Sequence, residues 1–88
     1  MFNLSISALD KIIFDGEAQS LTLPGAEGEL TILKNHIPLI TPLSKGKILI
    51  KTGNPSAGSG RGKEDLNFPI QSGVLEVSPE KVTVLVDL

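Results

Sequence analysis

A glycine-rich stretch is the first candidate for chemistry in this chain, because glycine-rich loops can hold phosphate groups. Residues 53–65 read GNPSAGSGRGKED, with four glycines and a Gly62–Lys63 pair. A P-loop requires a glycine five positions before such a pair and a Ser or Thr directly after it, since that hydroxyl holds magnesium. Ala57 stands at the first of these positions and Glu64 at the second. The stretch therefore fails the P-loop pattern.

The same stretch also fails the dinucleotide-binding pattern. Gly58 and Gly60 would need a third glycine where the chain has Lys63. Both kinds of site also need a following helix, whose N-terminal amides complete the anion site. The next residues, EDLNFPIQ, are acidic, then strand-like, and broken by a proline. We predict a long, flexible hairpin loop at 53–65, with no nucleotide, cofactor or metal bound.

Histidine and carboxylate chemistry is equally sparse. His36 is the only histidine, which excludes His-rich metal sites, and the chain has no cysteine for a zinc-thiolate site or a disulfide. No serine lies in a nucleophile-elbow context. Glu27 and Glu29 lie two apart, which places both carboxylates on one face of a strand, but no third ligand is nearby. We favour a solvated or partner-facing acidic loop, and we predict no catalytic residue.

Length and composition are typical of a small β domain. The 88 residues are 40% hydrophobic, mostly Ile, Leu and Val, with three Phe and no Trp or Tyr. Stiff β-branched side chains favour pleated sheets. The net charge of −2 gives no reason to expect nucleic acid binding, and no apolar run is long enough to span a membrane. We expect one soluble domain that binds no nucleic acid and does not insert into a membrane.

The elements that must position any site follow a period of two. Apolar and polar residues alternate at the start of the chain and in GELTIL, KILIKT and KVTVLVD. Turn signals such as Asp15–Gly16 and Pro24–Gly25 separate these runs, and no segment shows a helical period. The pattern predicts an all-β fold, an antiparallel β-sandwich or flattened barrel without substantial helix.

Five short motifs occur at family-like spacing along the chain. They are Gly-Glu-Leu at 28–30, His-x-Pro-Leu at 36–39, Lys-Gly at 45–46, Ser-Gly-x-Leu-Glu-Val at 72–77 and the terminal run at 82–85. Each motif alone is a weak signal, whereas the ordered set covers nearly the whole chain except the loop. On these motifs, the sequence resembles the N-terminal β-sandwich domain of the epsilon subunit of F-type ATP synthase.

The resemblance implies a fold and a role. It implies that residues 1–88 form one domain of two packed five-stranded sheets. It further implies a non-catalytic subunit of the rotor's central stalk, without a cofactor, that docks the gamma subunit to the c-ring. Proton or sodium flow through the ring would then drive ATP synthesis by rotation. The location implied is peripheral, at the cytoplasmic face of the bacterial inner membrane or at the stromal side of a thylakoid.

The resemblance also assigns residues to the two partners by matching positions. The loop expected to meet the c-ring consists of Glu27, Gly28, Glu29 and Leu30. The segment expected to face gamma contributes His36, Pro38, Leu39 and Thr41. We expect the apolar residues around these prolines to supply part of a docking surface.

Three departures and one alternative accompany the resemblance. Family members usually have Pro-Gly before the histidine, where this chain has Lys34 and Asn35, and the loop at 53–65 is longer than usual. In the family, two C-terminal helices usually follow this domain, and they inhibit ATP hydrolysis and in some members bind ATP. We expect this chain to show neither activity. The alternative is a small ligand- or carbohydrate-binding β-sandwich, although carbohydrate sites depend on exposed aromatic platforms such as Trp and Tyr.

Overall fold

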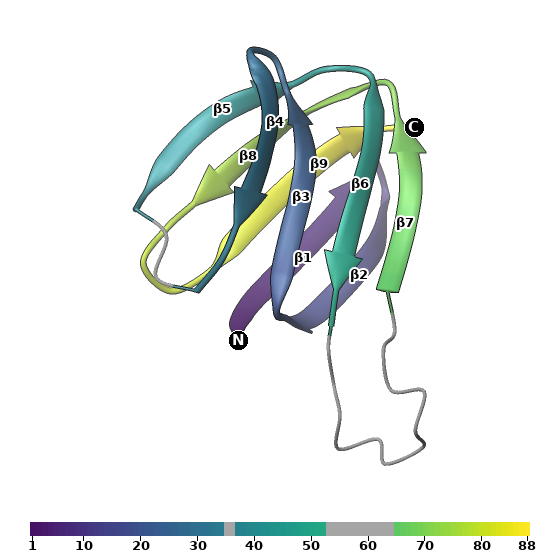
Figure 1. Cartoon of the computed structure of the whole chain (residues 1–88). Coiled ribbons are helices and arrows are strands. Elements are labelled where there is room, and N and C mark those ends of the chain that lie inside the picture. Colours follow the sequence, from purple (N-terminus) through teal and green to yellow (C-terminus); the bar gives the residue numbers. More distant parts are fainter. Residues whose placement is uncertain (35–36, 53–64) are drawn as a thin grey trace.

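The computed structural model describes residues 1–34, 37–52 and 65–88 of the chain, and these form nine β-strands and no helix (Figure 1). The strands are β1 (Phe2–Ala8), β2 (Lys11–Ala18), β3 (Ser20–Gly25), β4 (Gly28–Ile32), β5 (Leu39–Leu43), β6 (Gly46–Lys51), β7 (Asp65–Ile70), β8 (Ser72–Val77) and β9 (Val82–Asp87). In this described part of the chain, no helix is long and apolar enough to cross a membrane.

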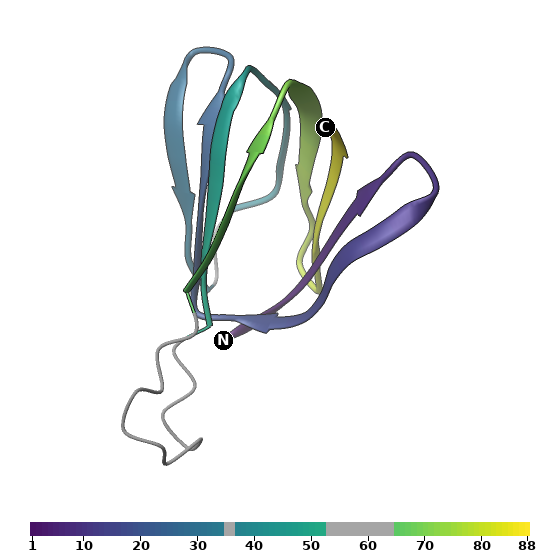
Figure 2. The same ribbon diagram turned by 90° about the vertical axis from the view of Figure 1, so that its right-hand side faces the viewer.

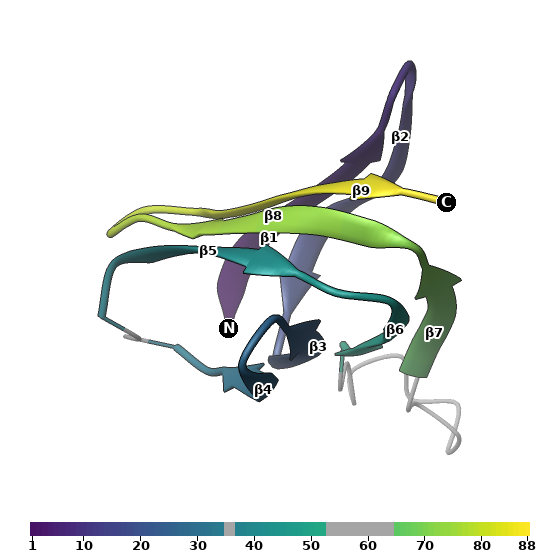
Figure 3. The same ribbon diagram turned by 90° about the horizontal axis from the view of Figure 1, so that it is seen from above.

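The strands form two layers that are joined along one side (Figures 2 and 3). One layer has the order β2-β1-β9-β8-β5, and the other consists of β3, β6 and β7 with β4 paired to β3. In the described residues, β5 and β3 share the single pair Leu43–Gly25, so the sheet bends sharply there. The result is a sandwich-like half-barrel with a five-stranded and a four-stranded layer.

The core lies between the two layers and follows from the period of two. In β9, Val82, Val84 and Val86 are buried, whereas Leu85 between them is exposed. Fifteen hydrophobic residues from both layers are buried in this way, and no polar or charged side chain of the described residues is. Burial of each large aliphatic side chain contributes about 1.5–3 kcal/mol to folding.

The predicted all-β class without helix is confirmed, with two refinements. The second layer has four strands in the described residues, where the resemblance implied five. The pairing is mixed, because β1 and β9 run parallel while the other paired strands are antiparallel. Parallel neighbours need a long crossover connection, so hairpin signals between successive strands do not reveal such a pair. The predicted flexible loop lies outside the described residues, apart from Asp65 at the start of β7.

Candidate functional site

The acidic residues predicted to meet the c-ring lie on the hairpin between β3 and β4, at the top in Figure 1. Glu27 is in the turn, Glu29 is near the start of β4, and both are exposed. Gly28 between them has a φ of 136°, in the region that favours glycine, so the glycine permits this turn. Leu30 is half-buried and packs against the core. This hairpin therefore presents carboxylates to solvent and anchors itself through Leu30.

The described residues predicted to face gamma lie in β5 or directly before it. Leu39 and Thr41 are half-buried on the inner side, because their partners in β8 are the buried Val77 and Leu75. Pro38 is exposed just before the strand. The sequence-predicted His36 lies outside the described residues. The structure therefore brings Pro38, Leu39 and Thr41 to one strand, but only Pro38 of the three is exposed.

The outer side of β5 belongs to an apolar row that crosses the five-stranded layer. Pro42 pairs with Val74 in β8, Val74 pairs with Leu85 in β9, Leu85 pairs with Ser7 in β1, and Ser7 pairs with Ile12 in β2. Directly opposite residues on one face of a sheet have Cβ atoms only about 4.5–5.5 Å apart. These positions therefore form one row across five strands, in which the half-buried Ser7 separates Ile12 from the apolar residues of β9, β8 and β5.

The apolar members of this row are largely open to solvent. Ile12 is 68% exposed, Leu85 56% and Val74 45%, and Ile40, two residues before Pro42, is 72% exposed. We call Ile12, Ile40, Pro42, Val74 and Leu85 the outer apolar row. Single exposed apolar residues need no explanation, but a contiguous group is typical of a protein-docking surface.

Most of the outer apolar row was missed in the sequence. The sequence predicts a docking role for the apolar residues around Pro38, which include Ile40, but it predicts Val74 and Leu85 only as strand residues. A signal for them was present, because alternation in VLEVS and KVTVLVD places an apolar residue at the outward positions 74 and 85. Ile12 could not be aligned with them from the sequence, since its place depends on the parallel β1–β9 pair.

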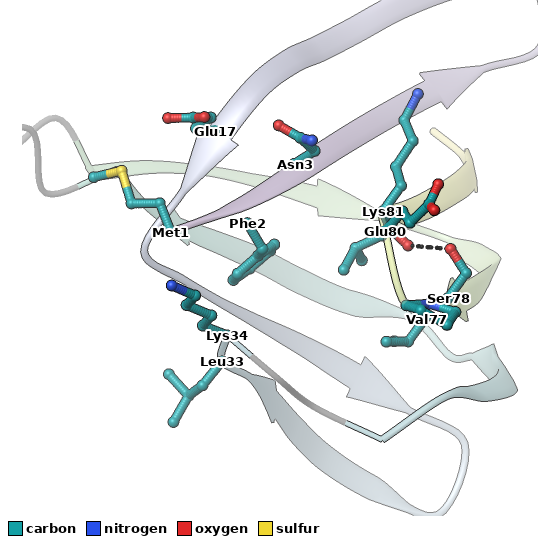
Figure 4. A pocket seen from close by; sticks show the side chains of 12 residues that line it. Met1, Phe2, Asn3, Glu17, Leu33, Lys34, Val77, Ser78, Glu80 and Lys81 are labelled. Atoms are coloured by element: carbon teal, nitrogen blue, oxygen red, sulfur yellow. Dashed lines mark hydrogen bonds between the residues drawn. The ribbon is translucent and has the colours of Figure 1, made fainter.

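We call the turn at Glu27–Leu30 the acidic turn. A cleft of about 210 Å³ opens at the opposite end of the sandwich from it. Phe2 and Val82 of the five-stranded layer line it together with Leu33 and Lys34, which follow β4 (Figure 4). Beside it, the Ser78 hydroxyl donates a hydrogen bond of 2.8 Å to the Lys81 carbonyl and closes the β8–β9 turn. The charged residues on its rim, Glu17, Lys34, Glu80 and Lys81, are all exposed and of both signs. The cleft thus lacks a buried polar group that could orient a small ligand.

No candidate metal site is assembled in the part of the chain that the structure describes. There, no group of three or more His, Cys, Asp or Glu side chains is placed to hold a metal ion. Glu27 and Glu29 of the acidic turn have no third acidic or histidine neighbour among these residues. The described surface instead carries the outer apolar row on one face and the exposed Glu27 and Glu29 at one end.

Known proteins of one kind resemble this chain. Residues 1–88 match the family described as "ATP synthase, Delta/Epsilon chain, beta-sandwich domain". The ATP synthase epsilon chain of Xanthomonas euvesicatoria pv. vesicatoria is 44% identical over 82 residues, which cover 93% of this chain and 53% of that relative. The epsilon chain of Xanthomonas campestris pv. campestris is 45% identical over the same shares. This chain thus spans about half the length of these relatives.

Solved structures with the same fold include two mitochondrial ATP synthases. A chain in the cryo-EM structure of the Euglena gracilis enzyme, OSCP/F1/c-ring, superposes with a TM-score of 0.80 at 20% identity, over 97% of this chain and 49% of that chain. A chain of the Tetrahymena thermophila central stalk/c-ring gives 0.74 at 20% identity, over 99% and 63%. These likenesses concern the fold. Together with the family match and the bacterial relatives, they lead to one conclusion: the chain belongs to the family of the β-sandwich domain of ATP synthase delta and epsilon chains.

Proposed function

We propose that this chain is a non-catalytic component of the central stalk of an F-type ATP synthase, where it joins the gamma subunit to the c-ring. The observation that carries the proposal is the outer apolar row, five exposed residues on the outer face of β2, β9, β8 and β5. A surface of this kind favours docking of a protein. The solved structures of similar fold come from assemblies named for the c-ring and central stalk, which supports the choice of partners.

Gamma is the partner proposed for the outer apolar row. The row includes Ile40 and Pro42 of β5, the strand whose matching positions the family resemblance assigns to gamma. Residues buried at the centre of an interface are depleted in charge, as this row is. In this proposal Leu39 and Thr41 support β5 from inside, and Pro38 extends the contact beyond the start of the strand.

The c-ring is the partner proposed for the acidic turn at Glu27–Leu30. This turn lies at an end of the sandwich, whereas the outer apolar row lies on one of its faces, so both partners can bind at the same time. The Ala26 N–H donates a hydrogen bond of 3.1 Å to the carbonyl of Pro42, which belongs to the row. The acidic turn and the docking face therefore adjoin within one small unit.

This placement accounts for a coupling role without chemistry in the chain itself. The nine described strands act as one domain that is carried round with gamma and the ring, so that proton or sodium flow drives ATP synthesis elsewhere in the complex. The domain is peripheral to the membrane and held there through its partners, and its bacterial relatives favour the cytoplasmic face of an inner membrane. We propose that it binds no ATP.

The test is the affinity of the chain for the gamma subunit of its own source, measured by titration calorimetry. Leu85→Asp places a charge in the centre of the outer apolar row, and we expect about 100-fold weaker binding, since central interface residues contribute most of the affinity. Thr31→Asp is the matched control, because Thr31 is also exposed but lies on the four-stranded layer. It should bind as the unchanged chain does.

Two results would contradict the proposal. Equal weakening by both substitutions would mean that the outer apolar row is not the docking face. Absence of gamma binding by the unchanged chain, combined with saturable chemical-shift changes at Phe2 or Val82 on addition of small sugars, would support the ligand-binding alternative at the cleft.

A further inference from the structure

Two turns at the same end of the sandwich are tied together by Ser44. The Ser44 N–H donates a hydrogen bond of 2.8 Å to the Pro24 carbonyl, at the end of β3. Its hydroxyl lies 3.2 Å from the same carbonyl oxygen and 3.4 Å from that of Gly25, within donating distance of both. Ser44 thus links the turn after β5 to the strand that leads into the acidic turn.

Close backbone packing surrounds this link. A Cβ added at Gly46 would lie 2.7 Å from Cβ of Pro24, and one added at Gly25 would lie 2.7 Å from the Gly28 carbonyl oxygen. Real Cβ atoms do not approach other atoms so closely, so both positions require glycine. Gly46 therefore lets the turn after β5 pack against Pro24 of β3, and Gly25 lets the backbone close within the β3–β4 hairpin.

The link matters because few contacts join the two layers at this point, among them the hydrogen bond from the Ala26 N–H to the Pro42 carbonyl. In the described residues, β3 and β5 share one paired position, Gly25 with Leu43. Ser44 directly follows Leu43, and β5 is the strand whose outer side carries Ile40 and Pro42 of the outer apolar row. Force applied to the acidic turn therefore reaches β5 through a short connection that includes the Ser44 hydrogen bonds.

We propose that Ser44 is a positioning residue for the acidic turn. It holds this turn in a fixed orientation on β5 and so connects the proposed c-ring contact to the proposed gamma contact. This inference rests on the proposed function. The Ser44 side chain is exposed, so its hydroxyl contributes little to the core. Its contribution is to the orientation of Glu27 and Glu29.

The experiment compares Ser44→Ala with Ser44→Thr, which keeps the hydroxyl, in two measurements. The first is hydrogen–deuterium exchange of the full chain, where Ser44→Ala should accelerate exchange at residues 26–29 and leave Ile48 and Ile50 of the core unchanged. The second is binding to the immobilised c-ring of the same source in detergent. We expect about fivefold weaker binding, equivalent to about 1 kcal/mol, the net value of one hydrogen bond. Ser44→Thr should match the unchanged chain in both hydrogen–deuterium exchange and c-ring binding.

Each other outcome contradicts a specific statement. If Ser44→Ala accelerates exchange equally throughout the core, the residue is merely structural and the inference is overturned. If Glu29→Lys weakens c-ring binding but Ser44→Ala does not, the acidic turn docks without the need for Ser44, and the inference is again overturned. If Glu29→Lys has no effect either, the proposed c-ring contact is itself wrong, and the positioning role is lost with it.

Discussion

The two outer faces of this sandwich differ in chemistry although the strands behind them share one core. The five-stranded layer presents the outer apolar row, with Leu85 at 56% and Ile40 at 72% exposure. The four-stranded layer presents Thr22, paired with Thr31, together with Lys47 and Lys51 of β6. The Thr22 and Thr31 hydroxyls lie 3.4 Å apart, and this hydrogen bond is exposed. The outer face of the four-stranded layer is thus polar, whereas that of the five-stranded layer carries exposed apolar residues.

The difference shows that burial in the core does not dictate what the outward residues are. On both layers the inward positions are aliphatic, as a shared core requires. The outward positions are free to vary, so apolar residues there contribute little to the stability of the isolated chain. Their alignment across β5, β8 and β9 is best explained by a partner.

The largest expected effect is on the free energy of unfolding, and it distinguishes two adjacent residues of β8. Leu75 is fully buried, whereas its neighbour Val74 belongs to the outer apolar row. Leu75→Ala should lower the free energy of unfolding by about 3 kcal/mol, because it leaves a cavity between the layers. Val74→Ala should change it by about 0.5 kcal/mol or less. Urea denaturation of both variants measures this, and a comparable loss in Val74→Ala would show that the row has a role in folding.

A smaller effect is expected at the acidic turn, which is the contact proposed for the c-ring. Glu29→Lys reverses an exposed charge, and we expect about tenfold weaker attachment to the c-ring, with a slower association rate. The difference should shrink as salt is raised, because exposed charges are screened. Glu17→Lys makes the same charge change on β2, at the end of the sandwich with the cleft, and should have little effect. Equal loss in both variants would point to net charge, and not to the acidic turn.

Much of the fold could be predicted from the sequence because alternation is a local signal. The strand around Val82–Asp87 and the hairpin at Gly25–Gly28 follow from neighbouring residues and turn chemistry. The parallel pairing of β1 with β9 could not be predicted, since it joins segments about as far apart as the chain allows. Register between distant strands depends on the packing of the whole core.

The candidate site was predictable to a smaller extent for the same reason. Motif matching located the acidic turn and β5, but it placed Leu39 and Thr41 among the contacts without showing that they are half-buried. The outer apolar row combines residues from four strands, including Ile12 and Leu85, and no sequence window contains them together. Only the register of the folded sheet places them in one row, with Ser7 of β1 between Ile12 and Leu85.

The central claim is that gamma binds the outer face of the five-stranded layer, and site-specific photo-crosslinking tests it most directly. A photoreactive residue is introduced at Val74 in one variant and at Lys47, on the outer face of the four-stranded layer, in another. Each is assembled with the gamma subunit and irradiated, and adducts are identified by mass spectrometry. The account predicts an adduct with gamma from position 74 and none from position 47. An adduct from position 47 with none from position 74 would contradict it.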